Sequence, residues 1–316
     1  MLPYGAFRVL RVFIVARLCD RDSPAALVLV SRFRQTGVMK IFLLTALTMT
    51  AFAANSILNR LGVASYGMDP MAFAVIRTLA GAVMLTVLVM IRRAGGLNLW
   101  TAKRGAGAVA LALYMIGFSW SYLTLGAGLG ALILFGVLQV VMFGWAVFEG
   151  QRIAPIRWIG AGVAMIGLVV LLWPGGGAAV PMAGAAAMVL AGVAWAAYTL
   201  LGRGEADALA ASAGNFVLCF PLVAGALLVA DLGTITVPGT LVAIIAGAVT
   251  SGLGYALWYR CLPQLATVTA AVAQLSVPVI AVAAGTVLLA EPLTTRLLIA
   301  GALVLGGIAI SLKPSR

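Results

Sequence analysis

Long apolar runs, each close to 20 residues and separated by short polar connections, limit what this chain can fold into. A helix of about 20 apolar residues spans the hydrocarbon core of a bilayer. Because 64% of the residues are hydrophobic and 9% are charged, the chain is far more apolar than a soluble domain. It is predicted to be an all-α integral membrane protein with ten transmembrane helices, at residues 41–60, 71–91, 105–125, 129–149, 156–173, 182–202, 209–230, 240–260, 265–289 and 296–312.

The residue types that are missing exclude several classes of function. The chain has no histidine, and Cys19, Cys219 and Cys261 lie far apart without a CxxC spacing. His-dependent nucleophiles and His-ligated metals are therefore excluded, and no disulfide framework is indicated. We expect no metal, no cofactor and no enzyme activity. The net charge of +12 comes from basic residues in ones and twos, so no nucleic-acid partner is expected.

Lysine and arginine are distributed unevenly between the two sides of the predicted bundle. With the N-terminus inside, the inside segments from residue 32 onward carry 13 basic residues, and the outside connections carry only Arg60 and Arg296. Short cytoplasmic loops are enriched in Lys and Arg. Both termini are therefore predicted to be cytoplasmic.

Residues 1–38 differ from the rest of the chain, because they mix six arginines and two aspartates with apolar residues. One interpretation is a basic helix that lies in the membrane interface. We favour the other, in which Met39 is the true start and residues 1–38 form an upstream extension with no role in transport.

Two apolar segments, AGVAMIGLVVLLWP at 161–174 and AGALVLGGIAISLKP at 300–314, are similar and stand 139 residues apart. The offset places Gly162 on Gly301 and Gly167 on Gly306. Ten spans then divide into residues 40–175 and residues 180–314, with five spans in each half. Because five is odd, the second half must cross the membrane in the opposite sense, which predicts an inverted repeat.

Several segments within 40–314 resemble the drug/metabolite transporter superfamily, with its paired EamA-type domains. They are Asn55, DPMAFAVIR at 69–77, LILFGVLQVVMFGWAVFEG at 132–150, WAAYTLLGR at 195–203 and AQLSVPVIAVAAGTVLLAEPL at 273–293. One departure from an even repeat matters: Ser276 and Pro278 stand where the first half has Val137 and Gln139. Pro278 is therefore expected to break the ninth span without a counterpart in the fourth.

The resemblance implies a secondary transporter in the cytoplasmic membrane of a bacterium, exporting small organic metabolites such as amino acids. Its partners would be the lipid bilayer, the metabolite and, as an open alternative, a proton. A non-transporting membrane scaffold or assembly protein is the competing hypothesis, and the oligomeric state stays open.

Arg77 is the strongest candidate for a substrate-binding residue, because a charge inside a span is unfavourable unless it has a function. It follows Pro70 by seven residues, which is about 10 Å into the helix. A guanidinium can bind a carboxylate in a bidentate manner. The alternative is structural, with Arg77 snorkelling outward or joining helices through backbone carbonyls.

Amides and aromatic residues inside the spans complete the predicted substrate site. Their alternative roles are hydrogen bonds between helices and the aromatic belt at the interface. The predicted set also includes Ser276, with Pro278 as the gating or helix-breaking residue, and its remaining members are Asn55, Tyr114, Trp120, Gln139, Trp195, Tyr198, Tyr255 and Gln274.

Glu149 and Glu291 close the fourth and ninth spans. As proton-coupling carboxylates they would need burial and a raised pKa. As structural acids they would bond to nearby amides or to Arg152 and Arg296, which is the interpretation that we favour.

Overall fold

The structure is a computed structural model that describes residues 24–92, 96, 97, 99, 101–150, 154–173, 180–202, 205–228, 233–261, 264, 265 and 273–311, with the backbone alone for residues 24–38 and Tyr259. The first 23 residues of the predicted N-terminal extension lie outside this part. From Pro24 the backbone is helical as far as Arg60. The chain divides into two compact units, Met1–Ala46 and Leu47–Arg316, and the packing described below is that of the second unit.

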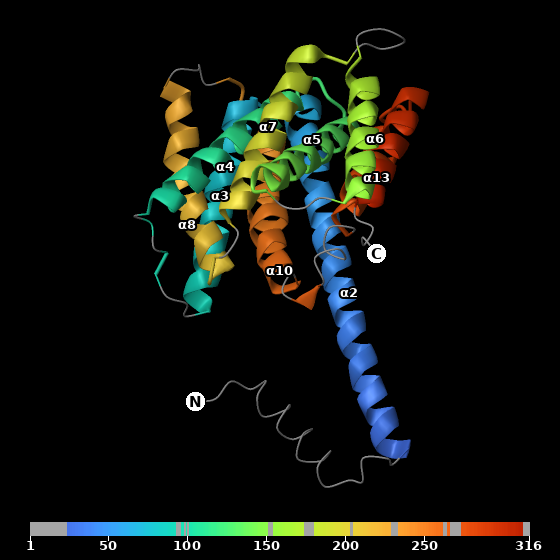
Figure 1. Ribbon diagram of the computed structural model, residues 1–316. Coiled ribbons are helices and arrows are strands. Elements are labelled where there is room, and N and C mark those ends of the chain that lie inside the picture. Colours follow the sequence, from blue (N-terminus) through green and yellow to red (C-terminus); the bar gives the residue numbers. More distant parts are fainter. Residues whose placement is uncertain are drawn as a thin grey trace. The chain divides into compact units, whose positions relative to one another are not determined.

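The described residues form helices and turns and contain no strand. Helix α2 contains the boundary between the two units, and Figure 1 shows the helices of the second unit packed side by side. The elements are α2 (Pro24–Arg60), the π-helix η1 (Leu61–Ser65), α3 (Pro70–Ile91), α4 (Ala102–Ser121), α5 (Ala127–Phe148), α6 (Pro155–Leu172), α7 (Met182–Leu201), α8 (Ala208–Gly225), the 3-10 turn η2 (Ala226–Leu228), α9 (Val237–Ile245), the π-helix η3 (Ala246–Leu253), α10 (Gly254–Cys261), α12 (Ser276–Leu289) and α13 (Thr295–Ser311).

Seven helical segments of the described chain are long and apolar enough to cross a membrane. They are Met39–Ser65, α3, α5, α6, α7, α8 and Val237–Trp258, the last of which runs through α9, η3 and most of α10. Helices α12 and α13 have 14 and 17 residues and fall short of the length for a span. Helix α4 has 20 residues but carries Lys103 and Arg104 in its first turn. The chain is thus a multi-pass α-helical membrane protein, and the predicted total of ten spans remains a prediction.

Helix α3 shows how the sequence sets the start of a span. The Asp69 carboxylate accepts hydrogen bonds from the backbone amides of Met71 and Ala72, both 2.9 Å long. Pro70 occupies the first helical position, where its missing amide hydrogen is not needed. This start places Arg77 two turns inside the helix, where its side chain is fully buried.

Helices α6 and α13 form the most extensive helix pair, and they lie side by side in Figure 1. A Cβ atom added to Gly160 would lie 2.5 Å from the carbonyl oxygen of Gly307, so glycine permits the close contact of the two backbones. Gly162 and Gly306, two of the four glycines that match between the halves, have open space where a Cβ would be. Similar sequence in the two halves therefore does not mean similar packing of each glycine.

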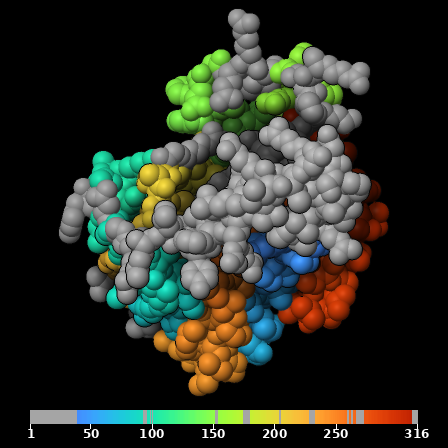
Figure 2. Space-filling view, turned by 90° about the horizontal axis from the view of Figure 1, so that it is seen from below, coloured from blue at the N-terminus to red at the C-terminus, as the bar shows by residue number. Residues whose placement is uncertain are grey.

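Several other helix pairs also connect residues 40–175 to residues 180–314. Helix α3 packs against α8 and η3, α4 packs against α7 and α8, and α5 packs against α7 and α12. In both views, the red residues of α13 lie on one side of this unit and the blue-green residues of α4 lie on the other (Figures 1 and 2). The larger cluster of buried apolar side chains contains residues of α3, α4, α5, α7, α8 and α13, and so draws on both halves.

Candidate substrate site

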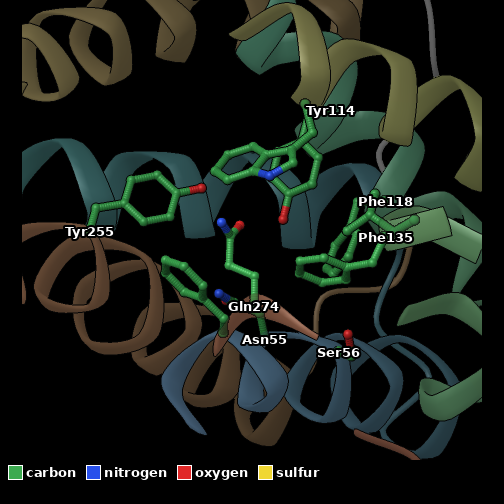
Figure 3. Close-up of a pocket in the computed structure, with 10 residues that line it drawn as sticks. Asn55, Ser56, Tyr114, Phe118, Phe135, Tyr255 and Gln274 are labelled. Carbon is green, nitrogen blue, oxygen red and sulfur yellow. The ribbon is translucent and has the colours of Figure 1, made fainter. Parts of the chain in front are cut away.

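A small pocket lies among helices from both halves of the chain (Figure 3). Six of its ten lining side chains are aromatic, and the polar ones are neutral amides and hydroxyls. The hydroxyls of Tyr114 and Tyr255 and the amide of Gln274 point towards its centre in Figure 3. The lining residues are Phe52, Asn55, Ser56, Tyr114, Phe118, Leu134, Phe135, Trp195, Tyr255 and Gln274.

Trp195 is the centre of the aromatic cluster. Its ring lies 4.9 Å from the ring of Tyr114 and 5.4 Å from that of Tyr255, measured between centroids. Behind it, Tyr198 stacks on the same indole at 5.4 Å. Tyr255 also meets the Phe52 ring edge-on at 5.8 Å. Offset and edge-to-face contacts of this kind stabilise aromatic clusters, and they give the pocket stiff, apolar walls.

The pocket is nearly closed in this conformation. The cavity volume is about 20 Å³, which is enough for a single water molecule. Small-molecule sites usually measure about 300–1,000 Å³. An organic molecule would therefore enter only after the surrounding helices move apart.

Arg77 lies directly behind the pocket wall. Its Nη2 donates to the Tyr114 hydroxyl at 3.3 Å and to the Ser251 hydroxyl at 3.4 Å. The guanidinium carbon lies 5.5 Å from the centre of the Tyr114 ring and 5.0 Å from that of Phe118. Arg77 thus joins α3 to α4 and η3, and its charge is held against two residues that line the pocket.

Asn55 connects the same network to α2. Its side-chain oxygen accepts hydrogen bonds from the hydroxyls of Thr250, at 2.6 Å, and Ser251, at 3.3 Å. Both hydroxyls belong to the π-helix η3, an irregular turn that often occurs at functional sites. These two hydroxyls occupy the side-chain oxygen of Asn55, so only its NH2 group, which is a donor, is left for a ligand.

The structure brings five predicted site residues to the pocket lining: Asn55, Tyr114, Trp195, Tyr255 and Gln274. Arg77 and Tyr198 form a second layer through contacts with these residues. Their part in substrate binding remains a prediction.

The remaining predicted residues lie elsewhere. Trp120 is 45% exposed, and it is not part of the lining. Gln139 is half-buried on α5 outside the lining, and the Ser276 hydroxyl donates to the carbonyl of Ala273. Pro278 is the third residue of α12, just after a turn at Leu275. In this first turn a backbone amide has no partner inside the helix, so the amide hydrogen that Pro278 lacks is not needed there. Its role as a gating or helix-breaking residue remains a prediction.

Five lining residues were absent from the predicted set: Phe52, Ser56, Phe118, Leu134 and Phe135. Two of them had a usable signal. Ser56 directly follows Asn55, and Phe118 stands one helical turn after Tyr114, on the same face. The other three, Phe52, Leu134 and Phe135, are apolar residues in apolar helices, and nothing in the sequence distinguishes them from residues that face lipid.

A polar cluster at the end of α2 holds three segments together. The Arg60 guanidinium donates to the carbonyls of Tyr122, at 2.8 Å, and Leu123, at 3.1 Å, and lies 3.7 Å from the Glu291 carboxylate. Glu291 in turn accepts a hydrogen bond of 2.7 Å from the backbone amide of Ala127, at the start of α5. Glu291 is thus a helix-end acid bound to amides, as the favoured interpretation expected, although its cation is Arg60 rather than Arg296.

Arg296 has different partners. It donates to the backbone carbonyls of Val170, at 2.8 Å, and Trp173, which joins the start of α13 to the end of α6.

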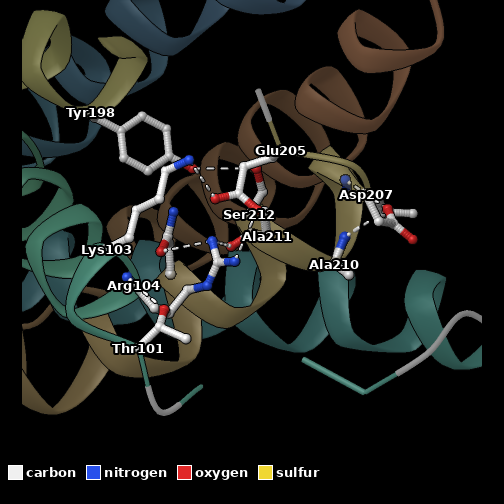
Figure 4. A network of polar contacts seen from close by, with 11 residues as sticks. Thr101, Lys103, Arg104, Tyr198, Glu205, Asp207, Ala210, Ala211 and Ser212 are labelled. Carbon is white, nitrogen blue, oxygen red and sulfur yellow. Dashed lines mark hydrogen bonds and ion pairs between the residues drawn. The ribbon is translucent and has the colours of Figure 1, made fainter. Parts of the chain in front are cut away.

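A second polar cluster joins α4 to the region before α8 (Figure 4). Glu205 lies 3.1 Å from Lys103 and 3.2 Å from Arg104, and Arg104 also donates to the carbonyl of Ala211. Burial alone would raise the pKa of Glu205, but the hydrogen bonds from Lys103 and Arg104 outweigh it and hold the pKa below its usual value. The cluster fixes the start of α4 to the start of α8.

No group of three or more metal-binding side chains occurs among the described residues. The polar atoms at the pocket are neutral amides and hydroxyls, with an arginine behind them.

The apolar helices and the pocket between them define a multi-pass α-helical membrane protein with an internal site. Residues 182–313 match the EamA-like transporter family. An uncharacterized protein of Pseudomonas aeruginosa is 44% identical over 279 residues, which cover 87% of this chain and 95% of the relative. The chain belongs to the EamA-like transporter family, in agreement with the resemblance to the drug/metabolite transporter superfamily.

Two further comparisons agree with this assignment. An uncharacterized transporter of Archaeoglobus fulgidus is 26% identical over 289 residues, covering 87% of this chain and 99% of the relative. A solved crystal structure of a protein 17% identical to this chain superposes with a TM-score of 0.62 over 86% of this chain and 96% of that one. At this level of identity, the likeness concerns the fold alone.

Proposed function

We propose that the protein is a secondary transporter that exports small organic metabolites such as amino acids across the cytoplasmic membrane of a bacterium. It works by alternating access, in which two inverted halves move against each other around a central site. The observation that carries this proposal is the pocket, which is lined by α2, α4 and α5 of the first half and by α7, α10 and Gln274 of the second.

The helix contacts support the inverted repeat and the ten spans. With α9, η3 and α10 counted as one span, the spans run from α2 as the first to α13 as the tenth. A two-fold axis in the membrane plane then relates each span to the one five places later. Helices next to such an axis pack against their own counterparts, and α3 with α8, α5 with α12 and α6 with α13 do so.

A further pair of contacts follows the same symmetry. The third span, α4, packs against the seventh, α8, and the symmetry-related pair is the eighth and second spans, η3 and α3, which also pack together. This agreement supports domain limits of 40–175 and 180–314. Ten spans put both termini on the same side of the membrane, and the distribution of lysine and arginine favours the cytoplasmic side.

The polar cluster of Arg60 and Glu291 suggests where the halves separate. Under the proposed orientation, the Arg60 and Glu291 cluster lies at the outer end of the bundle and holds the first half to the second. Release of substrate to the outside would require these contacts to break. The helical backbone is interrupted by a turn at Leu275, between Gln274 and Pro278, and this turn is a place where the chain can bend during this movement.

Counterflow in proteoliposomes tests the proposal. Vesicles containing the purified protein are loaded with an unlabelled amino acid, and uptake of the labelled form is followed, with aromatic and small apolar amino acids tried first. Uptake that requires internal substrate and is lost in Arg77→Ala supports a carrier. A folded protein that exchanges no metabolite, and whose Arg77→Ala and Gln274→Ala variants lose only stability, is a scaffold instead.

A further inference from the structure

Arg77 carries a positive charge that no described acidic side chain neutralises. An arginine keeps its proton in a protein, so burial cannot remove this charge. The chain has eight acidic residues, and the five in the described part stand at or beyond helix ends with other partners: Asp69, Glu149, Glu205, Asp207 and Glu291.

Arg77 also has unused hydrogen-bond donors. Its Nε and Nη1 are buried and have no hydrogen-bond partner among the described residues. The hydroxyls of Tyr114 and Ser251, which accept from Nη2, are neutral and stand at 3.3 and 3.4 Å. A buried charged group with open donors is unfavourable and favours an additional acceptor, preferably an anionic one.

The charge of Arg77 acts on the pocket through a single layer of side chains. Tyr114 and Phe118 line the pocket on one side and hold the guanidinium on the other. Electrostatic interactions are weakly screened in a buried, apolar site, so a charge about 5 Å behind the wall is felt inside it. These two rings already stabilise one cation, and the field of that cation repels a second.

We infer that the pocket binds the carboxylate end of an apolar or aromatic organic acid or amino acid and rejects organic cations. A carboxylate oxygen would accept a hydrogen bond from the Tyr114 hydroxyl, which Arg77 positions and polarises, and the apolar part would lie against Trp195, Tyr255 and Phe135. This inference rests on the proposed function, because it takes the pocket as the place where the transported molecule binds.

Three probes with the same ring and a chain of similar length separate the charge classes: 3-phenylpropionate is an anion, L-phenylalanine a zwitterion and 2-phenylethylamine a cation. The measurement is the shift in melting temperature of the purified full chain in detergent. We expect the two carboxylates to stabilise the protein and the amine to leave it unchanged. The inference is overturned if 2-phenylethylamine stabilises the protein as much as the carboxylates or more. It is also overturned if neither carboxylate stabilises the protein.

Two variants place the preference on the named residues. Tyr114→Phe removes the hydroxyl and Arg77→Gln removes the charge, and each should weaken binding of 3-phenylpropionate about tenfold. Arg77→Lys should retain part of the affinity. Each affinity is measured on the folded protein, so a lower yield of folded protein does not change it. If Arg77→Gln does not fold, Tyr114→Phe provides the test, and wild-type affinity in that variant contradicts the inference.

Arg104→Gln is the matched control. Arg104 is also a buried arginine, 6% exposed, but it lies outside the pocket lining and is paired with Glu205. The substitution should lower the melting temperature and leave the order of the three probes unchanged. A loss of carboxylate preference in this variant would mean that any buried arginine affects binding through stability, and would refute a specific role for Arg77.

Counterflow with the same probes separates this inference from the proposed function. Carboxylates that bind but are not exchanged across the membrane contradict transport and leave the anion site in place. Exchange of 2-phenylethylamine without exchange of the carboxylates supports a carrier and refutes the anion site.

Discussion

The Glu291 carboxylate accepts a hydrogen bond of 2.7 Å from the backbone amide of Ala127, 164 residues earlier in the chain. Two glycines make this contact possible, since a Cβ at Gly126 would lie 2.9 Å, and one at Gly285 2.6 Å, from a Glu291 oxygen. Ala290 precedes Glu291 in a left-handed conformation with φ of 53°, which is strained for alanine and turns the chain towards α5. One acid thus caps α5 and pairs with Arg60.

Replacing Glu291 should loosen this end of the bundle. Glu291→Ala removes a carboxylate from the positive end of α5, and we expect a loss of about 1–2 kcal/mol, measured by thermal unfolding in detergent. Glu149→Ala is the control, because Glu149 lies exposed at the other end of α5 with Trp145 as its partner. Equal losses in the two variants would contradict a special role for the Glu291 contacts.

The contact between α6 and α13 should tolerate no side chain at Gly160. Gly160→Ala places a methyl group 2.5 Å from the Gly307 carbonyl oxygen, and overpacking of this kind costs about 1–3 kcal/mol. On the same helix, Gly162 has open space around it. Gly162→Ala should therefore be neutral or stabilise the helix by up to about 1 kcal/mol. If the two variants have the same melting curve, the contact between α6 and α13 at Gly160 is not tight.

The cluster at Glu205 should make stability depend on pH. The pKa of this carboxyl is lowered in the folded protein from its usual value of 4.5, so folding favours the ionised form. The contribution is present above pH 4.5 and is lost as the pH falls through the lowered pKa. Between about pH 6 and about pH 3, the difference in melting temperature between the wild type and Glu205→Gln should shrink. A constant difference would mean that the charge of Glu205 contributes nothing.

The proposed orientation can be tested with single cysteines. In a variant without the three native cysteines, Tyr66→Cys should react in intact cells with a maleimide that does not cross membranes, because residue 66 lies on the predicted outer side. Arg92→Cys, on the predicted inner side, should react only after the cells are opened. The native side chains of Tyr66 and Arg92 are both exposed, so packing does not limit access of the reagent to either position. The reverse pattern would invert the topology.

The apolar runs predicted the helices well, because the length and polarity of a span depend on the bilayer and hardly on the neighbouring helices. Each predicted run coincides with a described helical segment. The run 265–289 does so through α12, which begins at Ser276, and residues 266–272 of this run lie outside the described part of the chain. Three of these segments are not among the helices that are long and apolar enough to span: α12 and α13 are too short, and α4 has the length but carries Lys103 and Arg104 in its first turn. Family membership was also readable from the motifs.

The site was predicted less completely, because helical periodicity cannot tell a cavity from lipid when both faces are apolar. Trp120 and Trp195 have the same side chain in similar surroundings along the sequence. In the structure, Trp120 is 45% exposed, and Trp195 meets three tyrosines in the interior. Phe52 and Phe135 line the pocket without any polar signal in the sequence.

By itself, the sequence determined that the chain is a multi-pass helical membrane protein of this family, since local composition decides which segments can enter a bilayer. Only the tertiary structure decided which residues meet. Arg77, Tyr114, Ser251 and Asn55 come from four separate helical segments. Arg60 comes from α2, Ala127 from α5, and Glu291 from the connection between α12 and α13. These contacts depend on the rotation and pairing of helices, which are set by the sum of many close contacts across the whole bundle and by no single segment.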